Sequence, residues 1–282
     1  MLANMGYDVW LGNNRGNKYS RMHVSLNPDT DKVFWKFSYH EMGTKDLPAM
    51  IDFILNATGR EKISYIGHSQ GNAQLFAALT LKSDYFTQRL NAFLAFGPVS
   101  NLANLNSTFL KTVASTKVDD LLTSMNIFNE FLPNRKSVEI LEKFTCSHLG
   151  IFCKGLLALI ADANPWDDEM SRFLVFLSKF PSGSSLQSVH HFADSVRNKR
   201  FSQLDSTPYN LGNIKDIPIS MFVGNDDLLA TVADNRVLKD ALEKNGALHF
   251  YKEYENMGHL TFFISRTNEH VFDAISILEK FN

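Results

Sequence analysis

The pentapeptide Gly67-His68-Ser69-Gln70-Gly71 holds the residues whose types and spacing most readily support chemistry. A β-rich apolar run, Ile63 to Ile66, precedes it, and small helix-compatible residues follow from Ala73. A serine between two glycines on a sharp strand-to-helix turn is typical of a nucleophile elbow. The glycines would leave room for a strained backbone, and the helix begun by Gln70 would point its N-terminal N–H groups at the reacting centre. A structural Gly-Ser turn is the alternative interpretation.

A serine hydroxyl needs an imidazole to take its proton and a carboxylate to orient that imidazole. In nucleophile-elbow enzymes the acid and then the histidine follow the serine along the chain, each just after a later strand. Asp226 and Asp227 follow an apolar run that ends at Val223, and His259 follows a run that ends near Tyr254. The pattern therefore predicts Ser69 as nucleophile, His259 as base and one of the two aspartates as the acid.

The remaining histidines lack this position, and we expect them to be structural or solvated. They are His23, His40, His148, His190, His191, His249 and His270. His68 is expected to shape the pocket, because neighbouring residues on a sharp turn point apart.

Alternating strands and helices are predicted to position these residues. Strands are expected at residues 8–11, 63–66, 92–96, 217–223 and 248–254. Helices are expected at residues 44–59 with Thr44 as the cap, and at 73–81, 232–244 and 268–281. This alternation predicts an α/β fold with a mostly parallel sheet covered on both faces. Residues from about 102 to about 205 show helical periodicity and no convincing strand. We therefore predict core segments at 1–101 and 207–282 and an inserted helical cap at 102–206.

Composition excludes several classes of protein. The formal net charge of the 282 residues is −2, without runs of like charge, so nothing indicates a nucleic-acid partner. No apolar run reaches membrane-spanning length, and no metal-ligand motif or phosphate-binding glycine loop occurs, so no cofactor is expected. Cys146 and Cys153 could form a local disulfide or remain free thiols. Asn56 and Asn106 stand in glycosylation triplets, which matter only in a secreted protein.

Two motifs together, Gly6 to Asn17 and Gly67 to Gly71, resemble the acid lipases, the family of the gastric and lysosomal enzymes. The resemblance runs nearly the full length of the chain. It implies an α/β-hydrolase with a helical cap that cleaves neutral lipid esters, such as triacylglycerols or cholesteryl esters, in a secreted or lysosomal setting. It also implies Asp227, directly before Leu228-Leu229-Ala230, as the acid, His259 as the base and the backbone N–H of Gln70 as an oxyanion donor. The pair Cys146 and Cys153 resembles a cap disulfide of the family.

Members of that family begin upstream, with a signal peptide, the first strands and a His-Gly loop that supplies a second oxyanion donor. This sequence begins after them, so we expect the strands at Val9 and Ile63 to lack a pairing partner. The predicted function is a serine hydrolase of neutral lipid esters. The alternative is a catalytically impaired, truncated lipase-like protein that binds lipid. A third interpretation is another α/β-hydrolase chemistry, such as a thioesterase or an acyltransferase.

Overall fold

The structure is a computed structural model. It describes residues 1–125, 130–132, 145–146, 148–165, 168–177, 179–180 and 182–281.

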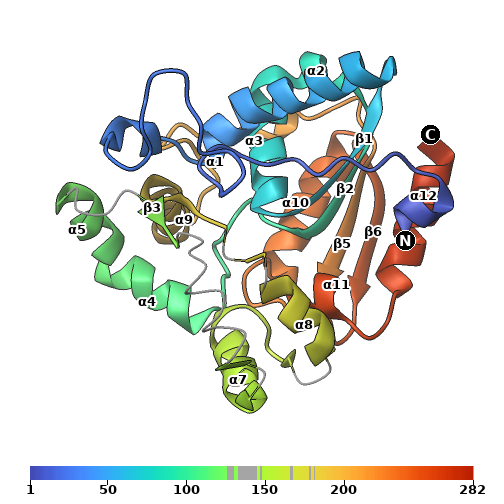
Figure 1. Cartoon of the computed structure of the whole chain (residues 1–282). Coiled ribbons are helices and arrows are strands. Elements are labelled where there is room, and N and C mark those ends of the chain that lie inside the picture. Colours follow the sequence, from blue (N-terminus) through green and yellow to red (C-terminus); the bar gives the residue numbers. More distant parts are fainter. Residues whose placement is uncertain are drawn as a thin grey trace.

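A four-stranded parallel sheet forms the centre of the fold (Figure 1). Its strands are β1 (Ile63–Ser69), β2 (Leu90–Pro98), β5 (Ile219–Gly224) and β6 (Leu248–Tyr254), in the order β1-β2-β5-β6. All three pairings are parallel, so the carboxyl ends of the strands share one edge. The predicted α/β class with a parallel sheet is confirmed in these strands and their helices.

Alternate residues of β2 and β5 face opposite layers, as the period of a strand requires. Phe93 and Ala95 pack on the side of α2 (Leu47–Thr58), α3 (Gln70–Thr87) and α10 (Val232–Lys244). Leu94 and Phe96 pack on the other side, against α12 (Glu269–Phe281). Both faces of the central strands are therefore buried, which explains their continuous apolar sequences.

The predicted strand at residues 8–11 is wrong, because the segment is irregular and Leu11 is 86% exposed. In Figure 1 it runs away from η1 (Leu2–Met5), which lies beside α12. Trp10 packs edge-to-face on Phe53 of α2, with ring centroids 6.0 Å apart. Within the described chain β1 is the edge of the sheet, so no ladder neighbour satisfies the backbone of this segment.

The helix predicted from Thr44 begins six residues earlier. Ser38 is the N-cap of α1 (Tyr39–Glu41), where it forms a capping box with Glu41. A π-helical segment, η3 (Met42–Asp46), then leads into α2. Thr44 instead donates its hydroxyl to the carbonyl of His40, and the predicted end at Gly59, with φ of +67°, is confirmed. The prediction missed the capping signature Ser38-x-x-Glu41, which lies within an aromatic-rich segment.

The region predicted as an insertion is mainly helical where the structure describes it. It holds α4 (Thr108–Thr116), α5 (Val118–Met125), α7 (Gly150–Ile160), α8 (Met170–Leu177) and α9 (Leu186–Asn198). It also holds one antiparallel pair, β3 (Glu130–Phe131) with β4 (Ser184–Ser185), which sequence periodicity did not predict because each strand is two residues long. Cys146 and Cys153 form a disulfide, which decides between the two alternatives. The boundaries at 101/102 and 206/207 stay predictions.

Three short elements complete the described structure: η2 (Lys32–Trp35), η5 (Leu211–Asn213) before β5, and α11 (Thr261–Ile264) just after His259. Among the helices described, none combines the length and apolar character needed to cross a membrane.

Candidate active site

Ser69 occupies a strained turn between the last residue of β1 and the first residue of α3. Its φ of +54° and ψ of −118° lie outside the regions that side chains ordinarily allow. A Cβ at Gly67 would lie 2.3 Å from Oδ1 of Asn72 and 2.9 Å from the ring of Tyr65, so any side chain there would force its neighbours to move. A Cβ at Gly71 would meet nothing closer than the Tyr65 hydroxyl at 3.6 Å, so the expected steric need at Gly71 is wrong. The strained, half-buried Ser69 has the geometry of a nucleophile elbow.

His259 and Asp227 form a buried pair at the carboxyl edge of the sheet. Nδ1 of His259 lies 2.8 Å from Oδ2 of Asp227. The other carboxylate oxygen of Asp227 accepts hydrogen bonds from the backbone N–H groups of Leu229 (2.8 Å) and Ala230 (2.7 Å). These two bonds fix the carboxylate, so Nδ1 carries the proton of the neutral ring and Nε2 is left as its acceptor.

The strand register brings the elbow to the same place. Ser69 pairs with Pro98 at the end of β2. The preceding Gly97 has φ of +49°, and a Cβ there would lie 3.2 Å from Nδ1 of His259 and 3.3 Å from Oδ2 of Asp227. The Ser69 turn and the His259–Asp227 pair therefore lie at the same edge of the sheet. Nε2 of His259 is buried and makes no hydrogen bond to any described residue, Ser69 included.

The rings of His68 and His259 lie close together in this site, tilted by 49°, and their surroundings shift their pKa values in opposite directions. Burial alone would lower the pKa of His259, but the charge and hydrogen bond of Asp227, with a smaller contribution from Asp162, raise it above its ordinary value. Burial and the nearby His259 lower the pKa of His68 well below its ordinary value. Nε2 of neutral His68 donates to the backbone carbonyl of His259 (2.7 Å), and the ring centroids are 4.6 Å apart. This hydrogen bond from His68 therefore fixes the backbone of His259.

Known proteins share both sequence and fold with this chain. A family model described as the alpha/beta hydrolase fold matches residues 2–265. Lysosomal acid lipase/cholesteryl ester hydrolase of Homo sapiens is 34% identical over 278 residues, which cover 93% of this chain and 68% of that protein. Gastric triacylglycerol lipase of Bos taurus is 34% identical over 281 residues, with the same two shares. The chain belongs to the acid lipase family.

Further relatives agree with this family. Lipase member K of Mus musculus is 31% identical over 308 residues, covering 99% of this chain and 73% of that protein. Among solved structures, a soluble variant of monoglyceride lipase from Saccharomyces cerevisiae superposes with a TM-score of 0.54 at 16% identity. That match covers 90% of this chain and 73% of the other, and it bears on the fold alone. With its relatives and fold, this acid lipase-family chain is a carboxylic ester hydrolase of the lipase type.

The other residues predicted for the site have separate places. Asp226 contributes backbone contacts: its N–H donates to the carbonyl of Met257 and its carbonyl accepts from Ala163. Gln70 is the first residue of α3, where a helix supplies no internal partner for the backbone N–H. Its side chain accepts from Ser188 of α9 and donates to the sulfur of Met42. Asp227, and not Asp226, therefore holds the ring of His259.

Sequence reasoning missed two residues that touch this site. Gly97 appeared only as the end of a strand, and its contact with the His259–Asp227 pair depends on strand register. Asp162, a buried residue of the predicted cap, belongs to no recognisable sequence motif. Its carboxylate accepts a hydrogen bond from the backbone N–H of Leu260, which lies 98 positions later in the chain. No local pattern could have indicated either contact.

One group of side chains outside the site has metal-ligand types. Asp119, Asp120 and His190 bring potential ligand atoms within 4.8 Å of one another. Arg197 already pairs with Asp119 (2.9 Å) and Asp120 (3.3 Å), so a protein cation occupies the place that a metal would take. The cluster is best explained as an ion-pair network between α5 and α9.

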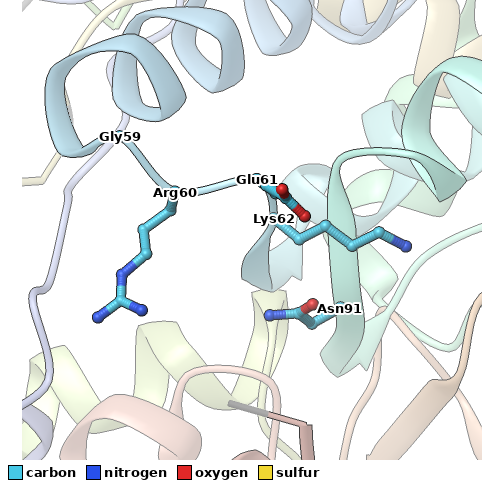
Figure 2. Close-up of a pocket in the computed structure, with 5 residues that line it drawn as sticks. All are labelled: Gly59, Arg60, Glu61, Lys62 and Asn91. Carbon is cyan, nitrogen blue, oxygen red and sulfur yellow. The ribbon is translucent and has the colours of Figure 1, made fainter.

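A surface hollow of about 410 Å³ lies at the opposite end of the sheet (Figure 2). Its lining residues are Gly59, Arg60, Glu61, Lys62 and Asn91. It adjoins the first residues of β1 and β2, whereas Ser69 stands at the last residue of β1. The hollow is therefore separate from the candidate active site.

Proposed function

We propose that the chain hydrolyses carboxylic esters of neutral lipids, triacylglycerols or cholesteryl esters, through Ser69, His259 and Asp227. The observation that carries this proposal is the 2.8 Å contact between His259 and Asp227, buried at the sheet edge where the strained Ser69 turn ends. The relatives named for cholesteryl ester and triacylglycerol hydrolysis support the substrate class.

The chemistry divides into two steps. Ser69 Oγ attacks the ester carbonyl while Nε2 of His259 takes its proton, and Asp227 stabilises the imidazolium that forms. The tetrahedral oxyanion accepts from the backbone N–H of Gln70. As the intermediate collapses, His259 returns the proton to the leaving alcohol, which leaves an acyl-serine. Water, deprotonated by His259, then attacks the acyl carbon, and Ser69 recovers its proton as the fatty acid departs.

Aromatic side chains next to the site suit an acyl chain. Phe263 of α11 is half exposed and packs edge-on against His68, with centroids 4.5 Å apart. Phe176 of α8 stacks on Phe263 (5.9 Å) and on Phe180 (5.0 Å). These rings lead from the His68–His259 pair toward the surface of the predicted cap. We propose that they line the path of the acyl chain.

The test compares wild-type protein with Ser69→Ala and a control, Ser83→Ala, on p-nitrophenyl esters of short and long acids and on emulsified triolein. Ser83 lies on α3 and its hydroxyl makes no hydrogen bond to a described residue. We expect Ser69→Ala to lose at least about a thousandfold in kcat, because the nucleophile is gone, and Ser83→Ala to match wild type. Activity retained by Ser69→Ala would refute the assignment.

The alternative is a lipid-binding protein without turnover, and one observation favours it: Nε2 of His259 makes no hydrogen bond to Ser69. This alternative predicts binding of a fluorescent triacylglycerol analogue without hydrolysis or fluorophosphonate labelling. Labelling at Ser69 would exclude it, since only an activated serine reacts readily.

We also propose a secreted or lysosomal location. The disulfide between Cys146 and Cys153 suits an oxidising compartment, and the glycosylation acceptors Asn56 and Asn106 are both exposed. Expression in a secretory host followed by endoglycosidase treatment tests this: a mass loss that vanishes in the double Asn→Gln variant supports glycosylation at these two residues.

A further inference from the structure

Asp162 is a fully buried carboxyl residue beside the candidate active site, and neither its sequence context nor the proposed triad explains it. Its Oδ1 accepts a hydrogen bond from the backbone N–H of Leu260 (2.9 Å), the residue directly after His259. Its Oδ2 is buried and makes no hydrogen bond to any described residue. A buried carboxylate oxygen without a hydrogen-bond partner is destabilising, so a purely structural role does not explain this carboxyl group.

The backbone around Asp162 is bound to the loop that carries the acid. Ala163 donates to the carbonyl of Asp226 (2.8 Å), and Leu228 donates to the carbonyl of Ala161 (2.9 Å). These two bonds make an antiparallel bridge between Asp162 and Asp227. The backbone of the residues on either side of Asp162 thus binds the acid loop (residues 226–228), and the side chain of Asp162 binds the histidine loop (residues 258–260).

The histidine loop is shaped to accept this carboxyl group. A Cβ at Gly258 would lie 2.3 Å from Oδ1 and 2.5 Å from Cγ of Asp162. Contacts that close do not occur, so the residue before His259 must lack a side chain for Asp162 to reach the Leu260 N–H.

The charges that face Asp162 come from the elements packed around it. His259 and the Leu260 N–H favour its ionised form, whereas Asp168 and Asp227 oppose it. Burial, the largest influence, raises the pKa of Asp162 to about 7. In turn the charged groups acting on His259 are Asp227 and Asp162, and the neutral ring of His68 lies beside it. Asp162 therefore changes charge near pH 7, so its influence on His259 depends on pH.

We propose that Asp162 is a positioning residue for His259, whose carboxyl group fixes the histidine loop against the acid loop and adds a second negative charge next to the imidazole. The inference deepens the proposed function, because it concerns the same His259. The fixing role depends on Oδ1 as an acceptor, and the electrostatic role depends on the charge.

Two substitutions separate these roles. Asp162→Asn keeps an oxygen acceptor for the Leu260 N–H and removes the charge, whereas Asp162→Ala removes both. Asp234→Asn is the matched control: Asp234 is a buried carboxyl whose pKa burial also raises, but its partners are Asn104 and Thr231. The titration of His259 is followed by NMR of protein labelled at histidine 13Cε1, with the resonance assigned by its loss in His259→Gln.

We expect the pKa of His259 to fall by at least about half a unit in Asp162→Asn and Asp162→Ala, and to stay unchanged in Asp234→Asn. We also expect Asp162→Ala to lower kcat on a soluble ester by about tenfold or more with little change in KM, and Asp162→Asn to retain more of kcat. An unchanged His259 titration in Asp162→Asn, or an equal shift in Asp234→Asn, would overturn the inference. The NMR result stands without turnover, so an inactive wild type would count against the proposed function alone.

Discussion

The backbone of Gly97 packs directly against the His259–Asp227 pair. Its φ of +49° favours glycine, and its Cα faces both side chains of the pair. The pair itself could be predicted from the order Ser69, Asp227, His259 and from the position of each residue after a strand. Gly97 and Asp162 could not, because each acts through contacts between segments that only the folded sheet and the predicted cap bring together.

Gly97→Ala is expected to lower activity beyond its effect on stability. Its Cβ would lie 3.2–3.4 Å from the ring of His259 and the carboxylate of Asp227, so the pair must shift. The control is Gly246→Ala, which has φ of +72° and no atom within 4 Å of the added Cβ. Both variants should lose about 1 kcal/mol of unfolding free energy, measured by urea denaturation. Only Gly97→Ala should lose about tenfold or more in kcat; equal kcat in the two variants would contradict the contact.

At the scale of elements, sequence patterns predicted those helices and strands that local interactions determine. The strand from 248 to 254 and the helix from 232 to 244 match β6 and α10, because turn residues bound both and their apolar patterns are strong. The predicted strand at 8–11 is wrong because a strand needs a second strand to pair with, and no local sequence pattern shows whether one is present. The cap at Thr44 failed because the π-helical turn of η3 lets one helix continue from Ser38 to Gly59.

The elbow offers a sharp comparison between its two glycines. Gly67→Ala would place Cβ 2.3 Å from Oδ1 of Asn72, whose Nδ2 donates to the carbonyl of Phe96 (2.7 Å). We expect it to cost about 1–3 kcal/mol, because β1 or α3 must move. Gly71→Ala meets only an ordinary contact with Tyr65 and adds helix propensity, so it should not lower the melting temperature. Calorimetry of both variants decides, and equal losses would show that the elbow is packed differently.

At the scale of the whole molecule, a buried polar network ties the first helix to the predicted cap. His191 of α9 stacks on Tyr39 of α1 with centroids 3.9 Å apart. Its ring nitrogens bind the hydroxyl of Ser38 (2.9 Å) and the carbonyl of Ser202 (2.7 Å). Burial lowers the pKa of His191 to about 4, although the Ser202 carbonyl opposes this change.

The network predicts acid sensitivity of the fold. An unfolded chain binds a proton at His191 near its ordinary pKa of about 6.5, whereas the folded protein binds it only near 4. Stability should therefore fall as the pH is lowered from 6.5 to 4, by up to about 3 kcal/mol. His191→Gln should flatten this part of the pH profile of unfolding free energy, whereas His249→Gln, at an exposed histidine, should not. A wild-type profile that is flat over this range, or equally steep in His191→Gln, would contradict the role of His191.

Treatment with a long-chain alkyl fluorophosphonate, followed by peptide mass mapping, tests the cooperation of Ser69 with His259 and Asp227 most directly. The geometry predicts one adduct, on Ser69, that forms at least about a hundredfold more slowly in His259→Gln and in Asp227→Ala. An adduct on another residue, no adduct, or an unchanged rate in His259→Gln would contradict the proposed triad.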